Sequence, residues 1–275
     1  MDLVRCRVAS PNQLASQRKT TNSSTAGGIT RTKTASTLCQ MTTKRLLDWV
    51  RTNHHEWLGY PSLTSTVELQ HQIWDTCLTG RLSLCPLNES PRNVLDIGCG
   101  TGAWAIDFAK AHPNSRVTGM DLSSIQPSTV PSNVAFVVGD FTAPWDIDHR
   151  FDYVHSRAIT IGVRDWGKLV DEVWRNLEPG GWVEFQEYHL PWTSDDGSVV
   201  ECPKFEQWNQ EIFRAAKKAG MTPDAILQVP DLLEKRGFVG AKTAWTKWAI
   251  GPWAKGAREK RVGELYLEVS AGAQY

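Results

Sequence analysis

The sequence predicts a doubly wound α/β fold built on a mostly parallel sheet, and three observations support this prediction. Short apolar strands alternate with amphipathic helices from about residue 92 onward, a pattern typical of strands joined by right-handed crossovers. A glycine-rich turn lies between the first of these strands and the helix that follows it. Later strands end in acidic residues, and the carboxyl ends of parallel strands line the crevice in which such folds bind ligands.

Each element follows from apolar periodicity and from the residues that interrupt it. The first strand is apolar at three of its four positions, 94–97, as expected for a strand that is buried on both faces. The helix that starts at residue 103 ends at His112 and Pro113, because proline cannot continue a helix. Further strands are predicted at 116–121, 134–140, 151–157, 182–187 and 239–250. The other predicted helices are 44–57, 67–79, 165–177, 205–219 and 231–236.

Three regions are predicted along the chain. Residues 1–40 are rich in Ser and Thr and carry six basic residues and one acid, so we expect them to be disordered. A mitochondrial transit peptide has a similar composition, but the stretch lacks a convincing amphipathic helix, which favours a disordered tail. Residues 41–91 are expected to form N-terminal helices. Residues 92–275 form the ligand-binding domain, with an insertion at about 188–236 that shapes a substrate pocket.

Composition and charge argue against several classes of function. Lys and Arg number 30, as do Asp and Glu, so the net charge of zero gives no reason to expect a nucleic-acid partner. The charged residues within 251–275 are interpreted as a solvated face. Six cysteines without a C-x-x-C pair or zinc spacing favour a reducing compartment and no metal site. No apolar run approaches the roughly 20 residues of a membrane span, so we expect a cytoplasmic protein, with the nucleus as the alternative.

The glycine-rich turn is predicted to bind a cofactor. Gly98, Gly100 and Gly102 allow a tight turn, and the helix N-terminus that follows offers free N–H groups to a ligand. With Ala103, the turn also satisfies the G-x-G-x-x-G/A pattern of dinucleotide-binding proteins. Asp96 favours a different cofactor, because a carboxylate there would repel a pyrophosphate and attract the ammonium and sulfonium groups of S-adenosylmethionine (SAM). A glycine turn that binds nothing is the remaining alternative.

Two further acids extend the predicted cofactor site. Asp121 ends the second strand, nineteen residues after Gly102, near the spacing expected for an acid that binds ribose hydroxyls. A helix N-cap is the alternative role for Asp121. Asp140 ends the third strand and is a candidate acceptor for an adenine amino group, with Phe141 covering the ring. Trp145 is interpreted either as a second cover for the ring or as a core residue.

Residues from about 69 to 252 resemble the fungal LaeA-like methyltransferases, which occur among secondary-metabolite genes and their regulators. The stretches that carry the resemblance are 94–109 (VLDIGCGTGAWAIDFA), 121–127 (DLSSIQP), 151–157 (FDYVHSR), 177–187 (LEPGGWVEFQE) and 250–253 (IGPW). The resemblance implies a Rossmann-like, class I methyltransferase fold with SAM as the cofactor.

The chain departs from this family in two places. Family members carry a Gly-Arg-x-Tyr-His-type segment ahead of the core that helps to close over the cofactor, and residues 53–60 lack that pattern. Relatives also continue through further helices to a last antiparallel strand beside the fifth. We therefore expect a C-terminally shortened relative in which this last strand is missing and backbone edges are exposed.

The predicted site has a cofactor-binding part and a catalytic part, and no metal is expected. The cofactor-binding candidates are Asp96, Gly98, Cys99, Gly100, Gly102, Asp121, Leu122, Asp140, Phe141 and His155. The candidates for a general base, chosen by their position at strand ends, are His155, Glu187 and His189. For His155 the alternative is a ring that only packs beside the cofactor, and for His189 it is an ordinary loop residue.

The predicted function is SAM-dependent methylation of a small-molecule acceptor in fungal secondary metabolism, with no nucleic-acid or membrane partner. One alternative is a catalytically impaired, LaeA-like regulatory or accessory protein that acts by binding a protein partner. Another is an NAD-dependent oxidoreductase, which the dinucleotide pattern allows.

Overall fold

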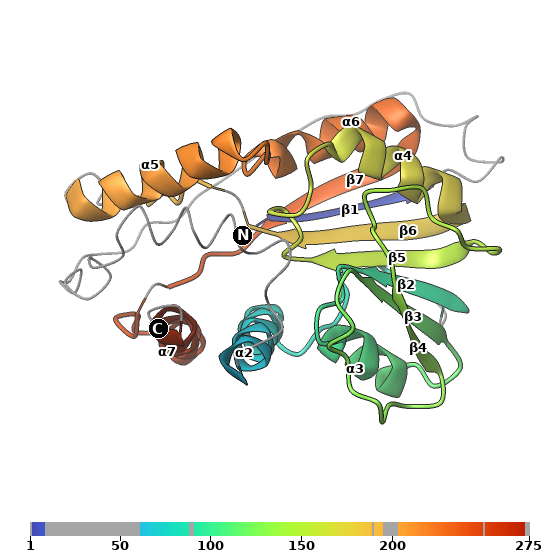
Figure 1. The fold of residues 1–275 in the computed structure, drawn as a ribbon, viewed down its shortest axis with the longest axis horizontal. Coiled ribbons are helices and arrows are strands. Elements are labelled where there is room, and N and C mark those ends of the chain that lie inside the picture. The colour runs from blue at the N-terminus through green and yellow to red at the C-terminus, as the bar shows by residue number, and fades with distance from the viewer. Residues whose placement is uncertain are drawn as a thin grey trace.

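A computed structural model describes residues 2–8, 61–87, 91–188, 190–194, 203–249 and 251–272 (Figure 1). Within these residues one sheet has seven strands, in the order β4-β3-β2-β5-β6-β1-β7. The strands are β1 (Asp2–Val8), β2 (Asn93–Ile97), β3 (Arg116–Asp121), β4 (Val134–Val138), β5 (Phe151–Arg157), β6 (Leu177–Glu187) and β7 (Phe238–Trp245). The helices are α2 (Pro61–Leu78), α3 (Ala103–Ala111), α4 (Trp166–Asn176), α5 (Pro203–Lys218), η3 (Ala225–Gln228), α6 (Val229–Arg236) and α7 (Ala257–Gly272).

Strands β4, β3, β2, β5 and β6 are parallel, as the sequence predicted. The parallel register aligns Ile97 of β2 with Met120 of β3 on one side and with Ser156 of β5 on the other. Because the strands run in the same direction, their carboxyl ends meet at one edge of the sheet. The glycine turn after β2 therefore lies at the same edge as Asp121 and Arg157, the last residues of β3 and β5.

Strand β1 corrects two expectations. It pairs antiparallel with β6 and with β7, so that Asp2 lies opposite both Glu187 and Trp245. The position beside the fifth core strand, which the sequence analysis expected to be empty, is thus filled by a segment that was expected to be disordered. Residues 4–8 contain a short alternation that the overall composition of residues 1–40 does not reveal. The apolar residues Val4, Cys6 and Val8 are separated by Arg5 and Arg7, which is the period-two pattern of a strand.

The two faces of the sheet are covered by different helices (Figure 1). Leu95 and Val154 pack with residues of α4 and α6, whereas their neighbours Val94 and Tyr153 pack with α3. This division follows from the strand geometry, in which successive side chains point to opposite faces. Helix α6, which the sequence analysis assigned to the inserted segment, is therefore part of the layer that covers the sheet.

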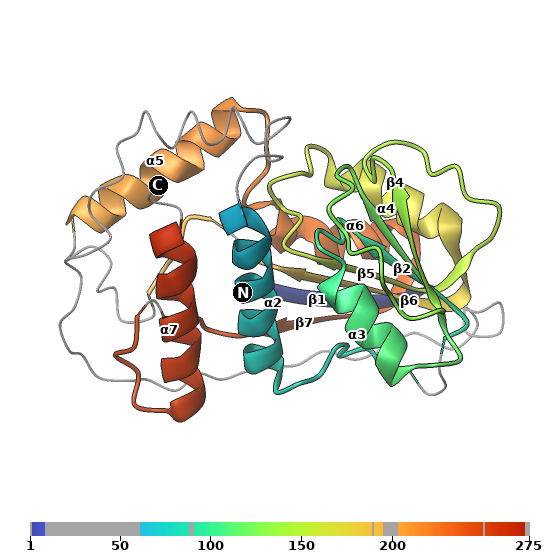
Figure 2. The same ribbon diagram turned by 60° about the horizontal axis from the view of Figure 1, so that its bottom comes forward.

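Helices α2 and α7 lie side by side at the edge of the sheet where the glycine turn is found (Figure 2). Ile73 and Cys77 of α2 pack with Val262 and Leu265 of α7. The interpretation of 251–275 as a solvated face is therefore wrong for one side of this helix, because a buried apolar stripe accompanies its exposed charges. None of the helices in the described ranges is long and apolar enough to cross a membrane. The predicted helix at 44–57 and the divergent segment 53–60 lie outside the described residues.

The pairing of β1 predicts a large effect of proline at Val4. Val4→Pro removes a backbone N–H from a strand that is paired on both sides, and should lower the free energy of unfolding by roughly 1–3 kcal/mol. Chemical denaturation measures this difference, and Val4→Ile is the matched control because it keeps both the N–H and the β-branched shape. Equal stability of the two variants would contradict the pairing.

Candidate cofactor site

The glycine turn begins where β2 leaves the sheet. The backbone N–H groups of Gly98 and Cys99 donate to the carbonyl oxygen of Met120 in β3, at 2.8 and 3.1 Å. Gly98, Gly100 and Gly102 have φ angles of 67°, 55° and 77°, a left-handed conformation that costs residues with a Cβ roughly 1–2 kcal/mol. The turn therefore depends on glycine for its backbone path.

Glycine is also needed because other side chains pack directly against the turn. A Cβ atom at Gly98 would lie 2.4 Å from Cγ2 of Ile159, and one at Gly102 would lie 2.3 Å from Cζ of Phe136. At Gly100 the nearest atom to such a Cβ is Cγ1 of Val67 in α2, at 3.2 Å. The turn is thus enclosed by residues from β4, from the segment after β5 and from α2.

Behind the turn, Asp96 and His155 form a buried pair. Oδ1 of Asp96 and Nδ1 of His155 are 2.8 Å apart, and both residues are almost completely excluded from solvent. The imidazole of His155 stacks on the indole of Trp104, with 3.6 Å between ring centroids and 6° between planes. Trp104 is itself held by a 2.8 Å bond from Nε1 to the carbonyl oxygen of Leu82. These contacts fix the orientation of the Asp96 carboxyl group.

Burial shifts the pKa values of Asp96 and His155 in the directions that favour their neutral forms. It raises the pKa of Asp96 to about 8, against the opposing effect of the nearby Arg157 guanidinium. It lowers the pKa of His155 well below its ordinary value, and the positive charge of Arg157 adds to this lowering. A cation that bound beside Asp96 would favour its ionised form and reverse the first shift.

Asp121 contacts the glycine turn directly. Its Oδ2 accepts a 2.8 Å bond from the N–H of Gly100, and its Oδ1 accepts bonds from the N–H and hydroxyl of Ser123 at 3.0 and 2.7 Å. The side-chain amide of Gln126 donates to the carbonyl oxygen of the same Gly100 at 2.7 Å. The backbone N–H and carbonyl of Gly100 are therefore bonded to the end of β3 and to the segment that follows it.

The remaining cofactor candidates are more scattered. Cys99 lies in the turn, with Sγ 3.8 Å from Nε2 of Gln126. Leu122 and Asp140 are exposed after β3 and β4, and Asp140 accepts bonds from the N–H and hydroxyl of Thr142. Phe141 is buried, and its ring would lie 3.4 Å from a Cβ at Gly98. In this structure Phe141 thus packs under the turn, whereas Leu122 offers exposed apolar surface beside it.

Two of the three candidate bases are buried, and the third is not described. His155 and Glu187 have no exposed surface, whereas His189 lies outside the described residues. The carboxylate of Glu187 accepts bonds from the N–H groups of Ile159 and Thr160, both at 3.0 Å, and from the hydroxyl of Thr160 at 2.7 Å. Burial raises the pKa of Glu187 to about 7. These contacts hold the segment after β5 against the glycine turn.

Several residues of this site were not among the candidates. Gln126 lies in the stretch 121–127 that carries the family resemblance, so the sequence contained a signal for it. Ile159 follows β5 by two residues, and no local pattern distinguishes it from an ordinary loop residue. His71 of α2 bonds to Arg157 at the end of β5, a contact between segments far apart in the sequence.

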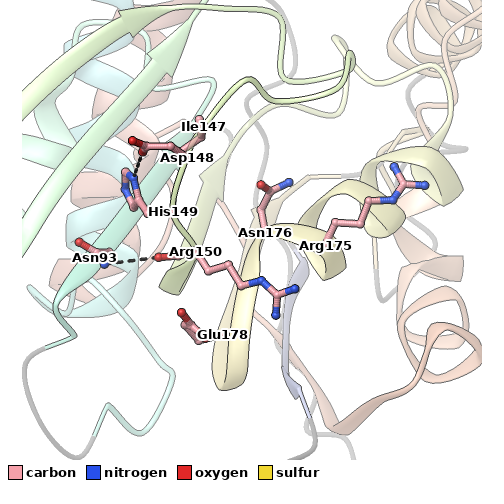
Figure 3. Close-up of a pocket in the computed structure, with 8 residues that line it drawn as sticks. All are labelled: Asn93, Ile147, Asp148, His149, Arg150, Arg175, Asn176 and Glu178. Carbon is pink, nitrogen blue, oxygen red and sulfur yellow. Dashed lines mark hydrogen bonds and ion pairs between the residues drawn. The ribbon is translucent and has the colours of Figure 1, made fainter.

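A hollow of about 470 Å³ lies at the other end of the parallel strands (Figure 3). Asn93, the first residue of β2, and Arg150, which precedes β5, line it together with His149, Arg175 and Glu178. Since the glycine turn lies at the carboxyl ends of these strands, the hollow is separate from the candidate cofactor site.

Comparisons with known proteins agree with this geometry. A family model described as a methyltransferase domain matches residues 69–239. Methyltransferase pytC of Aspergillus terreus is 34% identical over 200 residues, which are 72% of this chain and 62% of the relative. Probable methyltransferase tdiE of Emericella nidulans is 32% identical over 200 residues, 73% of this chain and 63% of the relative. Secondary metabolism regulator laeA of Aspergillus niger is 34% identical over 176 residues, 62% of this chain and 46% of the relative.

These relatives confirm the resemblance to the fungal LaeA-like methyltransferases. The chain spans less than two thirds of the length of each of these curated relatives.

The effect of the close packing around Gly98 on stability can be measured by comparison with Gly220, a glycine at which an added Cβ would meet no other atom within 4 Å. Gly98→Ala should destabilise the fold more than Gly220→Ala, because both glycines have positive φ but a Cβ at Gly220 would meet nothing within 4 Å. We expect a loss of roughly 1–2 kcal/mol at Gly220 from backbone strain, and a further 1–3 kcal/mol at Gly98 from the contact with Ile159. Chemical denaturation measures both.

A double-mutant cycle tests whether Ile159 causes the additional loss of stability in Gly98→Ala. In an Ile159→Ala background the penalty of Gly98→Ala should fall toward that of Gly220→Ala, because the clashing methyl group is gone. An unchanged penalty in that background would show that Ile159 is not responsible.

Proposed function

Because the chain belongs to the methyltransferase-domain family, we propose that it transfers a methyl group from SAM to a small-molecule acceptor. The observation that carries this proposal is the buried carboxyl group of Asp96, which lies behind a glycine turn whose Gly100 is bonded to Asp121. A cationic cofactor would compensate the burial of Asp96, and Asp121 is an acceptor for ribose hydroxyls.

The same residues argue against a dinucleotide cofactor. A pyrophosphate bound at this turn would lie near the carboxyl group of Asp96, whose ionised form is already disfavoured by burial. A second negative charge would raise the pKa of Asp96 further, whereas an ammonium or sulfonium would lower it. We therefore propose SAM, with Asp96, the glycines and Asp121 as its principal contacts.

We propose that the buried residues position the reactants. SAM supplies an electrophilic methyl group when bound, and correct alignment of two reactants contributes roughly 7–11 kcal/mol to lowering a barrier. His155 orients Asp96, and Glu187 holds Ile159 and Thr160, so neither is proposed as the base. His189 and the predicted insertion at about 188–236, apart from α6, remain the proposed sources of acid–base and substrate contacts.

Cofactor identity is tested by calorimetry with SAM, S-adenosylhomocysteine and NAD. We expect both adenosyl ligands to bind and NAD not to bind. Asp121→Asn should weaken SAM binding by about 10- to 100-fold, because a charge-assisted hydrogen bond contributes roughly 1.5–3 kcal/mol. Asp146→Asn, at an exposed position, is the matched control. Binding of NAD alone would favour the oxidoreductase, and binding of SAM without turnover on host metabolites would favour the regulatory alternative.

The pH dependence of SAM binding should report the ionisation of Asp96. Below a pKa of about 8 the free protein holds a proton on Asp96, which a cationic ligand must displace, so affinity should rise with pH up to about 8. One released proton corresponds to at most about tenfold in Kd per pH unit. Titration calorimetry in buffers of different ionisation enthalpy measures the released proton, and Asp96→Asn should abolish this release.

A further inference from the structure

Helix α2 lies directly over the glycine turn. Val67, in its second turn, provides the atom closest to a Cβ at Gly100, and the helix lies between α7 and α3 (Figure 2). Its contacts with α7 are apolar and involve Ile73 and Cys77. Apolar packing of this kind is not directional, so the placement of α2 relative to the turn requires a more specific contact.

His71 supplies such a contact on the side of α2 that faces the sheet. Nη1 of Arg157, at the end of β5, lies 2.9 Å from Nδ1 of His71, and Oδ2 of Asp107 in α3 lies 3.2 Å from Nε2. Arginine can only donate, so Nδ1 of His71 must accept and Nε2 carries the proton that is donated to Asp107. The neutral imidazole with one defined tautomer satisfies both partners at once.

Arg157 is fixed by contacts of its own. Its Nε donates to Oε1 of Gln186 at 2.8 Å, and its guanidinium lies 5.4 Å from the centre of the Trp74 ring. Gln186 in turn donates to Glu184, whose carboxylate accepts bonds from the segment that joins α2 to β2. A continuous polar chain therefore connects His71 to the interior of β6.

We propose that His71 is a positioning residue that fixes α2 over the glycine turn, and that this placement retains the methyl-donor cofactor. The inference rests on the proposed function, because it assumes that the turn binds SAM. His71 does not touch the reacting atoms in this role, and acts through the placement of α2.

Protonation of His71 would break this arrangement. A doubly protonated imidazole has no acceptor for Arg157 and places a second positive charge beside it. The titratable and charged groups around His71 are Arg157 and His155 of β5, Asp96 of β2, Asp107 of α3 and Asp75 of α2. Lys110 pairs with the other carboxylate oxygen of Asp107. Burial and Arg157 outweigh Asp107 and Asp75 and lower the pKa of His71, so the neutral form is present at pH 7.5.

The test compares two variants of His71 with a distant control. Gln at this position can accept from Arg157 and donate to Asp107 without titrating, whereas Ala does neither. His149→Gln, at the hollow on the opposite edge of the sheet, is the matched control. Hydrogen exchange of residues 66–78 in the cofactor-free protein reports the docking of α2, and calorimetry with SAM reports retention of the cofactor.

At pH 7.5 we expect His71→Ala to speed exchange in α2 and to weaken SAM binding about tenfold, with His71→Gln and His149→Gln within twofold of wild type. At a lower pH at which NMR shows the imidazole of His71 to be protonated, the wild type should exchange faster than His71→Gln, because Gln does not titrate.

Three results would overturn the inference. Unchanged α2 exchange in His71→Ala would refute the docking role, and faster exchange with unchanged SAM affinity would refute the coupling to the cofactor. Equal exchange of wild type and His71→Gln at a pH at which NMR shows His71 to be protonated would refute the requirement for a neutral imidazole. Failure of the wild type to bind SAM would refute the proposed function itself, and the exchange data would then decide the docking of α2 alone.

Discussion

The burial of one carboxyl group, that of Asp96, governs the chemistry of the candidate site. Removing an ionised carboxylate from water costs several kcal/mol, and the protein limits this cost by raising its pKa and by bonding it to His155. Trp104, which stacks on His155, and the nearby guanidinium of Arg157 complete the surroundings of the Asp96 carboxyl group. The free protein therefore favours the protonated form of this carboxyl group, and a cationic cofactor, unlike a pyrophosphate, would favour its ionised form.

The parallel core could be predicted from the sequence because its signals are local. Apolar runs, the glycine turn and the acid of Asp121 all lie within short stretches, and the structure places them at one edge of the sheet. Pairing between distant segments could not be predicted. The alternation in residues 2–8 is too short to identify a strand, and its partners are β6 and β7, far along the chain.

The candidate site shows the same division between local and long-range information. Asp96 and Asp121 were predicted as cofactor-binding residues because their positions relative to the glycines are characteristic. Ile159 and His71 matter only through contacts across the fold, with Gly98 and with Arg157, and their own sequence neighbourhoods do not reveal this. His155 and Glu187 were correctly located at strand ends, but whether a strand-end side chain faces solvent or the interior depends on the helices that cover it.

Strand β1 has a consequence for the order in which the protein is made. Residues 2–8 are synthesised well before residues 182–187 and 238–245, the two strands with which they pair. The parallel part of the sheet can assemble during translation and β1 can then pair with β6, while the other edge of β1 stays open until β7 is made. Pairing between such distant segments is slow, so a nascent chain exposes an unpaired strand edge at which it could associate with other chains.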